Sequence, residues 1–173
     1  YIHNLAGWGG SESADVKLTY YNNTTKNVIE RSPQLRFSNL EKQMTSGVEF
    51  QGRYDSGRFF TDFSLAHVLK NKVCDEDSAL SISTDGSTPD CVDDGFVGGY
   101  LVSMSQPEWS ANLGLGARFL DRKLEIGGRA IYYRQHESKF NSNYPNSAMV
   151  SYYINTPMSW DKIVTYDAYV NYK

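Results

Sequence analysis

The 173-residue sequence predicts an all-β fold built from antiparallel strands. Three observations lead to this prediction. Apolar and polar residues alternate with a period of two, the connections between the alternating stretches are of two kinds, and the two resulting faces differ in chemistry. Helix signals are poor, because apolar residues do not recur at a spacing of three and four over any useful length. The 13 tyrosines and 14 glycines also favour strands and turns.

Six stretches of the chain alternate in this way, and each reads as a strand with one apolar and one polar face. The clearest stretch begins at Trp109, where Ala111, Leu113 and Leu115 alternate with small or polar residues. The predicted strands are Asp15–Tyr21, Gly47–Tyr54, Arg58–Lys70, Trp109–Phe119, Lys123–Tyr133 and Val164–Tyr172.

The connections between these strands are either very short or very long. Asp55-Ser56-Gly57 and Leu120-Asp121-Arg122 have the composition of tight hairpin turns. The residues 22–46, 71–108 and 135–161 are predicted as polar loops of roughly 25 to 40 residues, which is long for a soluble domain. In an antiparallel sheet the short turns would lie at one end and the long loops at the other, as in an outer-membrane barrel.

The two faces of the predicted sheet differ in charge. The apolar face lacks charged residues and carries aromatic residues near the strand ends, as in the aromatic girdles of a membrane barrel: Tyr20, Tyr54, Phe59, Trp109, Phe119, Tyr132 and Tyr172. The opposite face carries Lys17, Glu49, Arg53, Asp62, Lys70, Arg118, Glu125, Arg129 and Asp167. A face so charged can line a wet or plugged lumen but cannot form the core of a soluble sandwich. We therefore predict a segment of an antiparallel transmembrane β-barrel; the alternative is a soluble sheet whose apolar face packs on a partner.

Composition and charge exclude several classes of protein. No apolar stretch approaches the roughly 20 residues that a membrane-spanning helix needs. The net charge of −3 without a Lys/Arg cluster gives no electrostatic footprint for nucleic acid. The first residues, Tyr1-Ile-His, do not resemble a signal peptide, so the sequence reads as a mature product or a piece of a longer chain.

The two cysteines, Cys74 and Cys91, flank an almost wholly polar segment. This arrangement favours a disulfide that closes a surface loop, worth about 3 kcal/mol by loop entropy, and hence an oxidising compartment. The alternative is a pair of free thiols in a cytosolic protein. Asp75, Asp77 and Asp90 make the loop acidic, but their spacing matches no cation-binding loop, so we predict no metal site.

Several segments resemble the TonB-dependent outer-membrane receptors, most closely the branch that takes up haem, haemoglobin or haemophores. They are Cys91-Val-Asp-Asp-Gly-Phe-Val-Gly-Gly-Tyr-Leu, the run from Pro107 to Tyr133, Tyr20 to Ile29, and Gly47-Val-Glu-Phe. The resemblance covers most of the chain. It implies a 22-stranded barrel closed by a plug, located in the outer membrane of a Gram-negative bacterium. It further implies that ligand binds on the extracellular side and is imported by the TonB complex at the expense of the proton-motive force.

The chain departs from this family in length. Such receptors are several times longer, and the plug domain has no counterpart here. We therefore expect residues 1–173 to be part of one barrel domain, from its C-terminal half. Six strands with two open edges would leave backbone unpaired in lipid, so this segment should not span a membrane alone.

Haem capture requires a histidine or tyrosine placed to ligate iron. His136, just beyond the fifth predicted strand, is the best candidate among the three histidines, although an ordinary loop histidine is the alternative. Tyr144, Tyr152 and Tyr153 could stack on a porphyrin or contact a protein ligand, or serve only in packing. His67 falls on the apolar face, where we expect an interface residue.

No motif of a catalytic site is present, and in particular no Gly-x-Ser-x-Gly elbow. The sequence therefore predicts a receptor, without enzymatic activity or a catalytic cofactor, whose partners are haem or a haem carrier, the TonB complex through a plug, and outer-membrane lipid. Two alternatives stay open: an outer-membrane barrel enzyme of protease or phospholipase type, and a secreted soluble β-sheet binding module.

Overall fold

The computed structural model of the chain describes residues 1–31, 37–82, 86, 89–93, 107–134 and 162–173. Its strands are β1 (Ile2–Asn4), β2 (Ser13–Arg31), β3 (Phe37–Asp55), β4 (Phe59–Cys74), β5 (Cys91–Asp93), β6 (Trp109–Phe119), β7 (Leu124–Arg134) and β8 (Ile163–Tyr172). Two short helices accompany them, η1 (Trp8–Gly10) and α1 (Glu76–Ile82). Neither is long and apolar enough to cross a bilayer.

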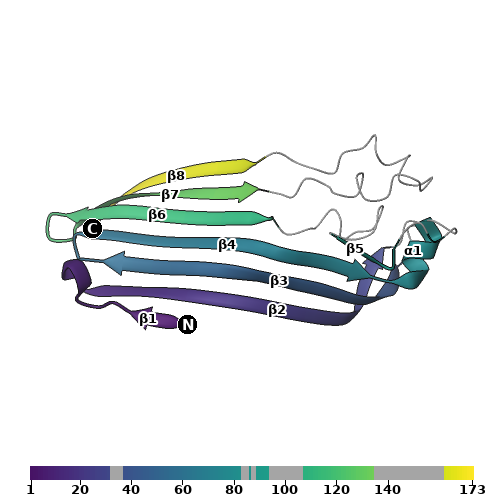
Figure 1. The fold of residues 1–173 in the computed structure, drawn as a ribbon. Coiled ribbons are helices and arrows are strands. Elements are labelled where there is room, and N and C mark those ends of the chain that lie inside the picture. The colour runs from purple at the N-terminus through teal and green to yellow at the C-terminus, as the bar shows by residue number, and fades with distance from the viewer. Residues whose placement is uncertain (32–36, 83–85, 87–88, 94–106, 135–161) are drawn as a thin grey trace.

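All of these strands belong to one antiparallel sheet, in the order β1-β2-β3-β4-β6-β7-β8, with β5 paired to β4. The described strands lie in a single layer (Figure 1). The all-β antiparallel prediction is confirmed, and each of the six predicted strands is present. The three-residue strands β1 and β5 were missed because alternation cannot be read over so few residues.

The register sorts the side chains onto the two predicted faces. Directly paired residues share a face of the sheet. One cross-strand row joins Leu18, Phe50, Leu65, Ala111, Tyr132 and Val164. The neighbouring row on the other face joins Lys17, Gln51, Ser64, Asn112, Ile131 and Thr165. We call these the apolar face and the charged face.

Both predicted turns are present at one end of the sheet, which we call the turn end (Figure 1). In the turn between β3 and β4, Gly57 has a φ of 80°. The Gly57 backbone N–H donates a hydrogen bond to the Asp55 carboxylate at 2.7 Å. Between β6 and β7, Leu120, Asp121 and Arg122 have positive φ. The opposite end, with α1 and β5, is the loop end.

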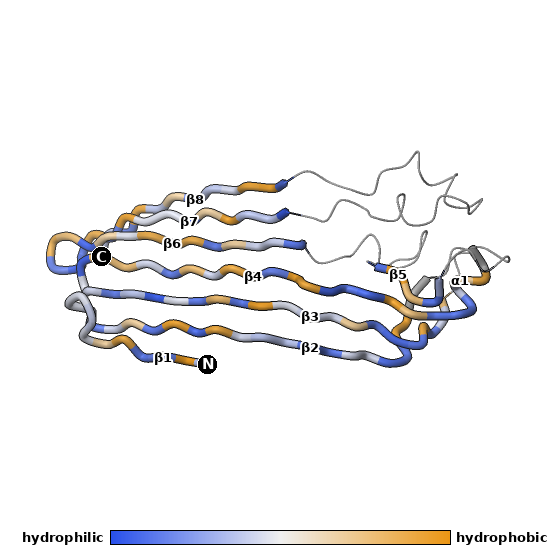
Figure 2. Tube along the Cα trace, in the orientation of Figure 1, coloured by the Kyte–Doolittle hydropathy of each residue, from blue (hydrophilic) through white to orange (hydrophobic). Residues whose placement is uncertain are grey.

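The prediction of a loop over residues 22–46 is wrong over the described residues, because 22–31 belong to β2 and 37–46 to β3, which pair as one long hairpin. Each strand has 19 residues, against 11 in β6 and β7. Each strand of the hairpin is therefore about 25 Å longer than β6 or β7 at the usual rise per residue. Alternation failed to reveal these residues because polar residues predominate on both faces over residues 22–27 and 41–46, where β2 and β3 are mostly blue and white (Figure 2).

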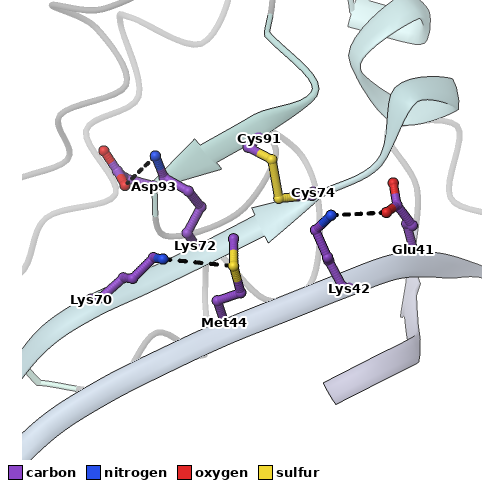
Figure 3. Close-up of a disulfide and its surroundings, with 8 residues drawn as sticks. All are labelled: Glu41, Lys42, Met44, Lys70, Lys72, Cys74, Cys91 and Asp93. Carbon is purple, nitrogen blue, oxygen red and sulfur yellow. Dashed lines mark hydrogen bonds and ion pairs between the residues drawn. A yellow bond between two sulfur atoms is a disulfide. The ribbon is translucent and has the colours of Figure 1, made fainter. Parts of the chain in front are cut away.

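The predicted loop over residues 71–108 also contains regular structure. β4 continues to Cys74, α1 follows, and β5 pairs with β4. Asp75 caps α1, since its carboxylate accepts hydrogen bonds from the Ser78 backbone N–H at 3.1 Å and hydroxyl at 2.7 Å. The predicted disulfide between Cys74 and Cys91 is present (Figure 3).

A small core lies beneath this folded segment. It consists of Leu40, Val73, Ala79 and Val92, each at most 2% exposed, with Val28 packed against it. The core thus joins β3, β4, α1 and β5, and we call α1 with β5 the cap. Burial of these side chains and the disulfide together hold the cap on the end of β4.

One predicted face assignment is wrong. Straight alternation through β4 would put Lys70 on the charged face, but the register shifts at Ser46/Gly47, where Gly47 pairs with Val68 and Ser46 with Lys70. Leu69 is therefore the extra residue of a β-bulge, which turns Lys70 onto the apolar face. The other eight charged-face assignments agree with the register.

Candidate functional site: the charged face of the sheet

A row of charged residues with alternating sign crosses the charged face. In order from β2 to β8 it contains Asp15, Arg53, Asp62, Gly114, Arg129 and Asp167, all in direct register. The Arg53 Nε donates to Asp15, and Arg129 Nη2 lies 4.0 Å from Asp62 Oδ2. Opposite charges placed directly across an antiparallel pair stabilise it, so this row favours the observed strand register.

Gly114 lies between Asp62 and Arg129 in this row and leaves room for the two charged side chains to approach each other. A Cβ at this position would lie 2.4 Å from Asp62 Oδ1, so a larger residue would displace the Asp62 carboxylate. The glycine thus lets Asp62 lean across β6 toward Arg129. On one side of this pair lies a hollow of about 370 Å³ lined in part by Lys17, Gln51 and Asn112. This surface offers many charged and amide groups to a polar partner.

A second cluster on the same face is centred on Arg118 in β6. Its Nη1 is 2.9 Å from both oxygens of Asp55, and its Nε donates to Glu125 Oε2 at 3.1 Å. The Tyr169 hydroxyl donates to the other oxygen of Glu125 at 2.9 Å, and the guanidinium lies 4.4 Å from the centroid of the Phe60 ring. One arginine therefore joins β3, β4, β6, β7 and β8 at the turn end.

The connections at the turn end are also joined to one another. Arg122, in the turn between β6 and β7, pairs with Glu12, which precedes β2. The Glu12 backbone N–H donates to the Asp55 carbonyl at 2.8 Å. A Cβ on Gly57 would lie 2.3 Å from Glu12 Oε1, so the glycine leaves room for this ion pair. These contacts link three connections that are far apart in the sequence.

On the apolar face, toward the loop end, the rings of His67 and Trp109 form a stacked pair. Their ring centroids are 3.9 Å apart with an interplanar angle of 12°, and His67 Nδ1 is 3.1 Å from the Glu108 carbonyl oxygen. Tyr20 and Val48 lie in the same cross-strand row. His67 is therefore on the apolar face, as its place in the alternation predicts.

The sequence-predicted ligand residues His136, Tyr144, Tyr152 and Tyr153 lie outside the described residues. Among the predicted site residues, the structure brings together only Cys74 and Cys91. Sequence reasoning missed the Arg118 cluster, although Asp55 and Arg118 both adjoin predicted turns at the same end. The missing information was the strand order, which puts residues 63 positions apart in contact.

Comparison with known proteins agrees with this architecture. A family model described as TonB dependent receptor-like, beta-barrel, matches residues 5–173. The chain is 45% identical over 187 aligned positions to the hemophilin receptor of Acinetobacter baumannii, which covers all of this chain and 18% of that relative. It is 31% identical to a probable TonB-dependent receptor of Haemophilus influenzae, over 77% of this chain and 14% of the relative. The chain spans less than a fifth of the length of these relatives. Because the family model matches almost every residue, the chain belongs to the TonB-dependent receptor β-barrel family.

Proposed function

We propose that this chain is part of an outer-membrane receptor that binds haem or a haem-carrying protein outside the cell and imports the ligand by TonB-coupled active transport. The observation that carries the proposal is the 45% identity to a hemophilin receptor along the whole chain. The chain would contribute its strands to a 22-stranded barrel in a Gram-negative outer membrane, closed by a plug that contacts the TonB complex.

The two faces of the sheet support a membrane location. Large apolar side chains stand on the apolar face, where Leu115 is 53% and Val170 is 70% exposed, and no second layer covers them among the described residues. A soluble module would expose this surface to water at a high cost, whereas lipid tails would cover it. The charged face would then line the lumen and meet the plug.

The proposed orientation puts the turn end in the periplasm and the loop end outside the cell. The β2–β3 hairpin and the cap would then project above the membrane, where a protein ligand could reach them. We propose His136 as a ligand of the haem iron, with Tyr144, Tyr152 and Tyr153 beside the porphyrin or the carrier. The protein would act by binding and translocation and not as an enzyme.

A spectroscopic titration tests the proposed binding. The full-length receptor is purified in detergent and titrated with haem and with a haem-loaded carrier, and the Soret band is followed. We expect a shifted band that weakens in His136→Ala and persists in the matched variant His3→Ala. The absence of any spectral change with haem or a haemoprotein would contradict the haem assignment, and hydrolysis of a model peptide or ester would favour the enzyme alternative.

A growth assay tests transport. A Gram-negative strain that can neither make haem nor take it up receives the full-length gene, with the haem carrier as its sole source of haem. We expect growth that depends both on this gene and on a functional TonB complex. Equal growth without the TonB complex would contradict energy-coupled import.

A further inference from the structure

Four lysines gather on the apolar face at the loop end, beyond the row that contains His67 and Trp109. Lys70 pairs with Ser46, Lys72 pairs with Met44, and Lys42 pairs with both Lys26 and Cys74. These pairings put the lysines in the three consecutive rows that follow the bulge. We call Lys26, Lys42, Lys70 and Lys72 the lysine cluster.

The bulge at Leu69 decides on which face this cluster lies. His67 pairs with Val48 on the apolar face, and Lys70 pairs with Ser46, the next residue of β3 on that face. Figure 3 shows the Lys42, Lys70 and Lys72 side chains on the same side of β3 and β4 as Met44. Without the extra residue, Lys70 and Lys72 would point to the charged face.

The position of the cluster along the strands matches the headgroup region of a bilayer. From Phe59 to His67 the apolar face of β4 extends about 26 Å along the strand, which a strand tilt of about 40° reduces to about 20 Å of an apolar band roughly 25 Å tall. Lys70 lies about 10 Å beyond His67 along the strand. The rings of His67 and Trp109 would thus lie at the membrane interface, and the lysines would lie just beyond them, at the level of the polar headgroups.

Only two of the four lysines form an ion pair with a described residue. Lys72 Nζ is 3.7 Å from Asp93 and Lys42 Nζ is 3.0 Å from Glu41, whereas Lys70 Nζ lies 3.6 Å from the sulfur of Met44. Lys26 and Lys70 form no salt bridge with an acidic residue that the structure describes. Among the described residues, the four lysines thus have two carboxylates within salt-bridge distance.

Two of these lysines also repel each other. Lys26 and Lys42 are directly opposite on β2 and β3, and like charges in that arrangement destabilise a strand pair. A bound anion would offset this repulsion. A phosphate group has the charge and the acceptor oxygens that several lysine ammonium groups can share.

We propose that the lysine cluster binds the phosphate groups of lipid headgroups in the outer leaflet of the membrane. The proposal rests on the membrane orientation given under the proposed function. The bound lipid would hold the base of the β2–β3 hairpin at the membrane surface, just below the part of the hairpin that projects from the membrane.

A lipid-binding titration tests the proposal. The full-length receptor in non-ionic detergent is titrated with bisphosphorylated lipid A, and native mass spectrometry counts the bound lipid. We expect Lys70→Gln to weaken binding about fivefold, the factor typical of one lysine at a membrane surface, and the quadruple variant to weaken it further. Lys70→Arg should keep the affinity, and so should Lys123→Gln, which changes a lysine at the turn end.

Three results would overturn the proposal. They are equal binding by the wild type and the quadruple variant, equal binding of dephosphorylated lipid A, and competition by inorganic phosphate at the same concentration as the lipid. Heat-modifiable mobility on electrophoresis identifies folded samples, and the single variants decide if the quadruple variant does not fold. Haem-carrier binding is measured on the same samples, so that a failed ligand assignment is distinguished from a failed lipid site.

Discussion

Leu113 and Asn112 are adjacent residues of β6 whose side chains leave opposite faces of the sheet. Leu113 pairs with Phe63 and Ala130 on the apolar face, and Asn112 pairs with Ser64 and Ile131 on the charged face. Leu113 is 43% exposed, and both residues paired directly with it are apolar. In the proposed membrane location, lipid hydrocarbon would surround this side chain.

Leu113→Arg should therefore destabilise the full-length receptor in a lipid bilayer by about 2–4 kcal/mol if Leu113 lies near the midplane. The measurement is urea unfolding in lipid vesicles, followed by tryptophan fluorescence. The control Asn112→Arg puts the same charge on the charged face and should change the free energy of unfolding much less. Equal effects of the two variants would mean that the faces are assigned the wrong way round.

Arg118 joins two carboxylates at the turn end. Its side chain is 21% exposed, and the guanidinium contacts both Asp55 and Glu125. A planar fork can bind two carboxylates in this way, whereas an ammonium cannot match the geometry. Removal of the guanidinium would leave both carboxylates without their shared donor.

We expect Arg118→Gln to lower the free energy of unfolding of the full-length receptor by about 1–2 kcal/mol. Arg118→Lys should restore only part of this loss, because the charge returns without the fork. Arg58→Gln is the matched control, since Arg58 is exposed and contacts the Phe59 ring at 5.4 Å. Urea unfolding of the three variants checks the order, and an Arg118→Gln protein as stable as the control would contradict it.

Strand β4 consists of two parts that pair with β3 in different registers, because it contains one extra residue, Leu69. From Phe60 to Val68 it pairs with β3 in one register, and from Lys70 to Cys74 in another. A one-residue change of register exchanges the faces of every following side chain. In a regular strand, residues on one face are all odd or all even in number. Because of the bulge, Lys70 and Lys72 lie on the same face as His67.

Deletion of Leu69 should be tolerated better than deletion of Ala66. Without Leu69 the two halves of β4 form one regular ladder with β3, and each side chain keeps its face. Without Ala66, one part of the strand must present its apolar residues to the lumen. The fraction of folded barrel by heat-modifiable electrophoresis should be clearly higher for the Leu69 deletion, and equal fractions would contradict the register.

The cap is the element that the disulfide stabilises. By loop entropy the bond is worth about 3 kcal/mol, and the small core of Leu40, Val73 and Val92 adds to it. In the double variant Cys74→Ser, Cys91→Ser we expect faster amide hydrogen exchange in the cap and unchanged exchange in β6 and β7. Mass measurement should show a gain of about two hydrogens on reduction of the wild type, and no gain would refute the bond.

At the scale of the whole molecule, the described strands form an open single layer with an edge at β8 and, beyond β1, along much of β2. Unpaired backbone groups are not tolerated in hydrocarbon, so such a sheet needs further strands to close a barrel. The two relatives are several times longer than this chain, a length that leaves room for the further strands of a closed barrel.

A polypeptide restricted to residues 1–173 should therefore fail to insert into a membrane, whereas the full-length receptor should insert. Fractionation of cells that express each form, followed by urea extraction of the membranes, measures the difference. We expect the short form in the aggregated or urea-extracted fraction. A short form that stays monodisperse in plain buffer without detergent would contradict the membrane assignment.

The sequence by itself determined the six alternating strands, both short turns, the disulfide and the apolar face, because alternation, turn composition and cysteine spacing are local properties of the chain. Tertiary structure decided the rest. The part of the β2–β3 hairpin over residues 22–31 and 37–46 shows no sustained period of two. Lys70 changes face through a pairing irregularity, and Arg118 meets Asp55 only because β4 lies between β3 and β6. Each of these features depends on which strands are neighbours and in what register, and local patterns of polarity carry neither.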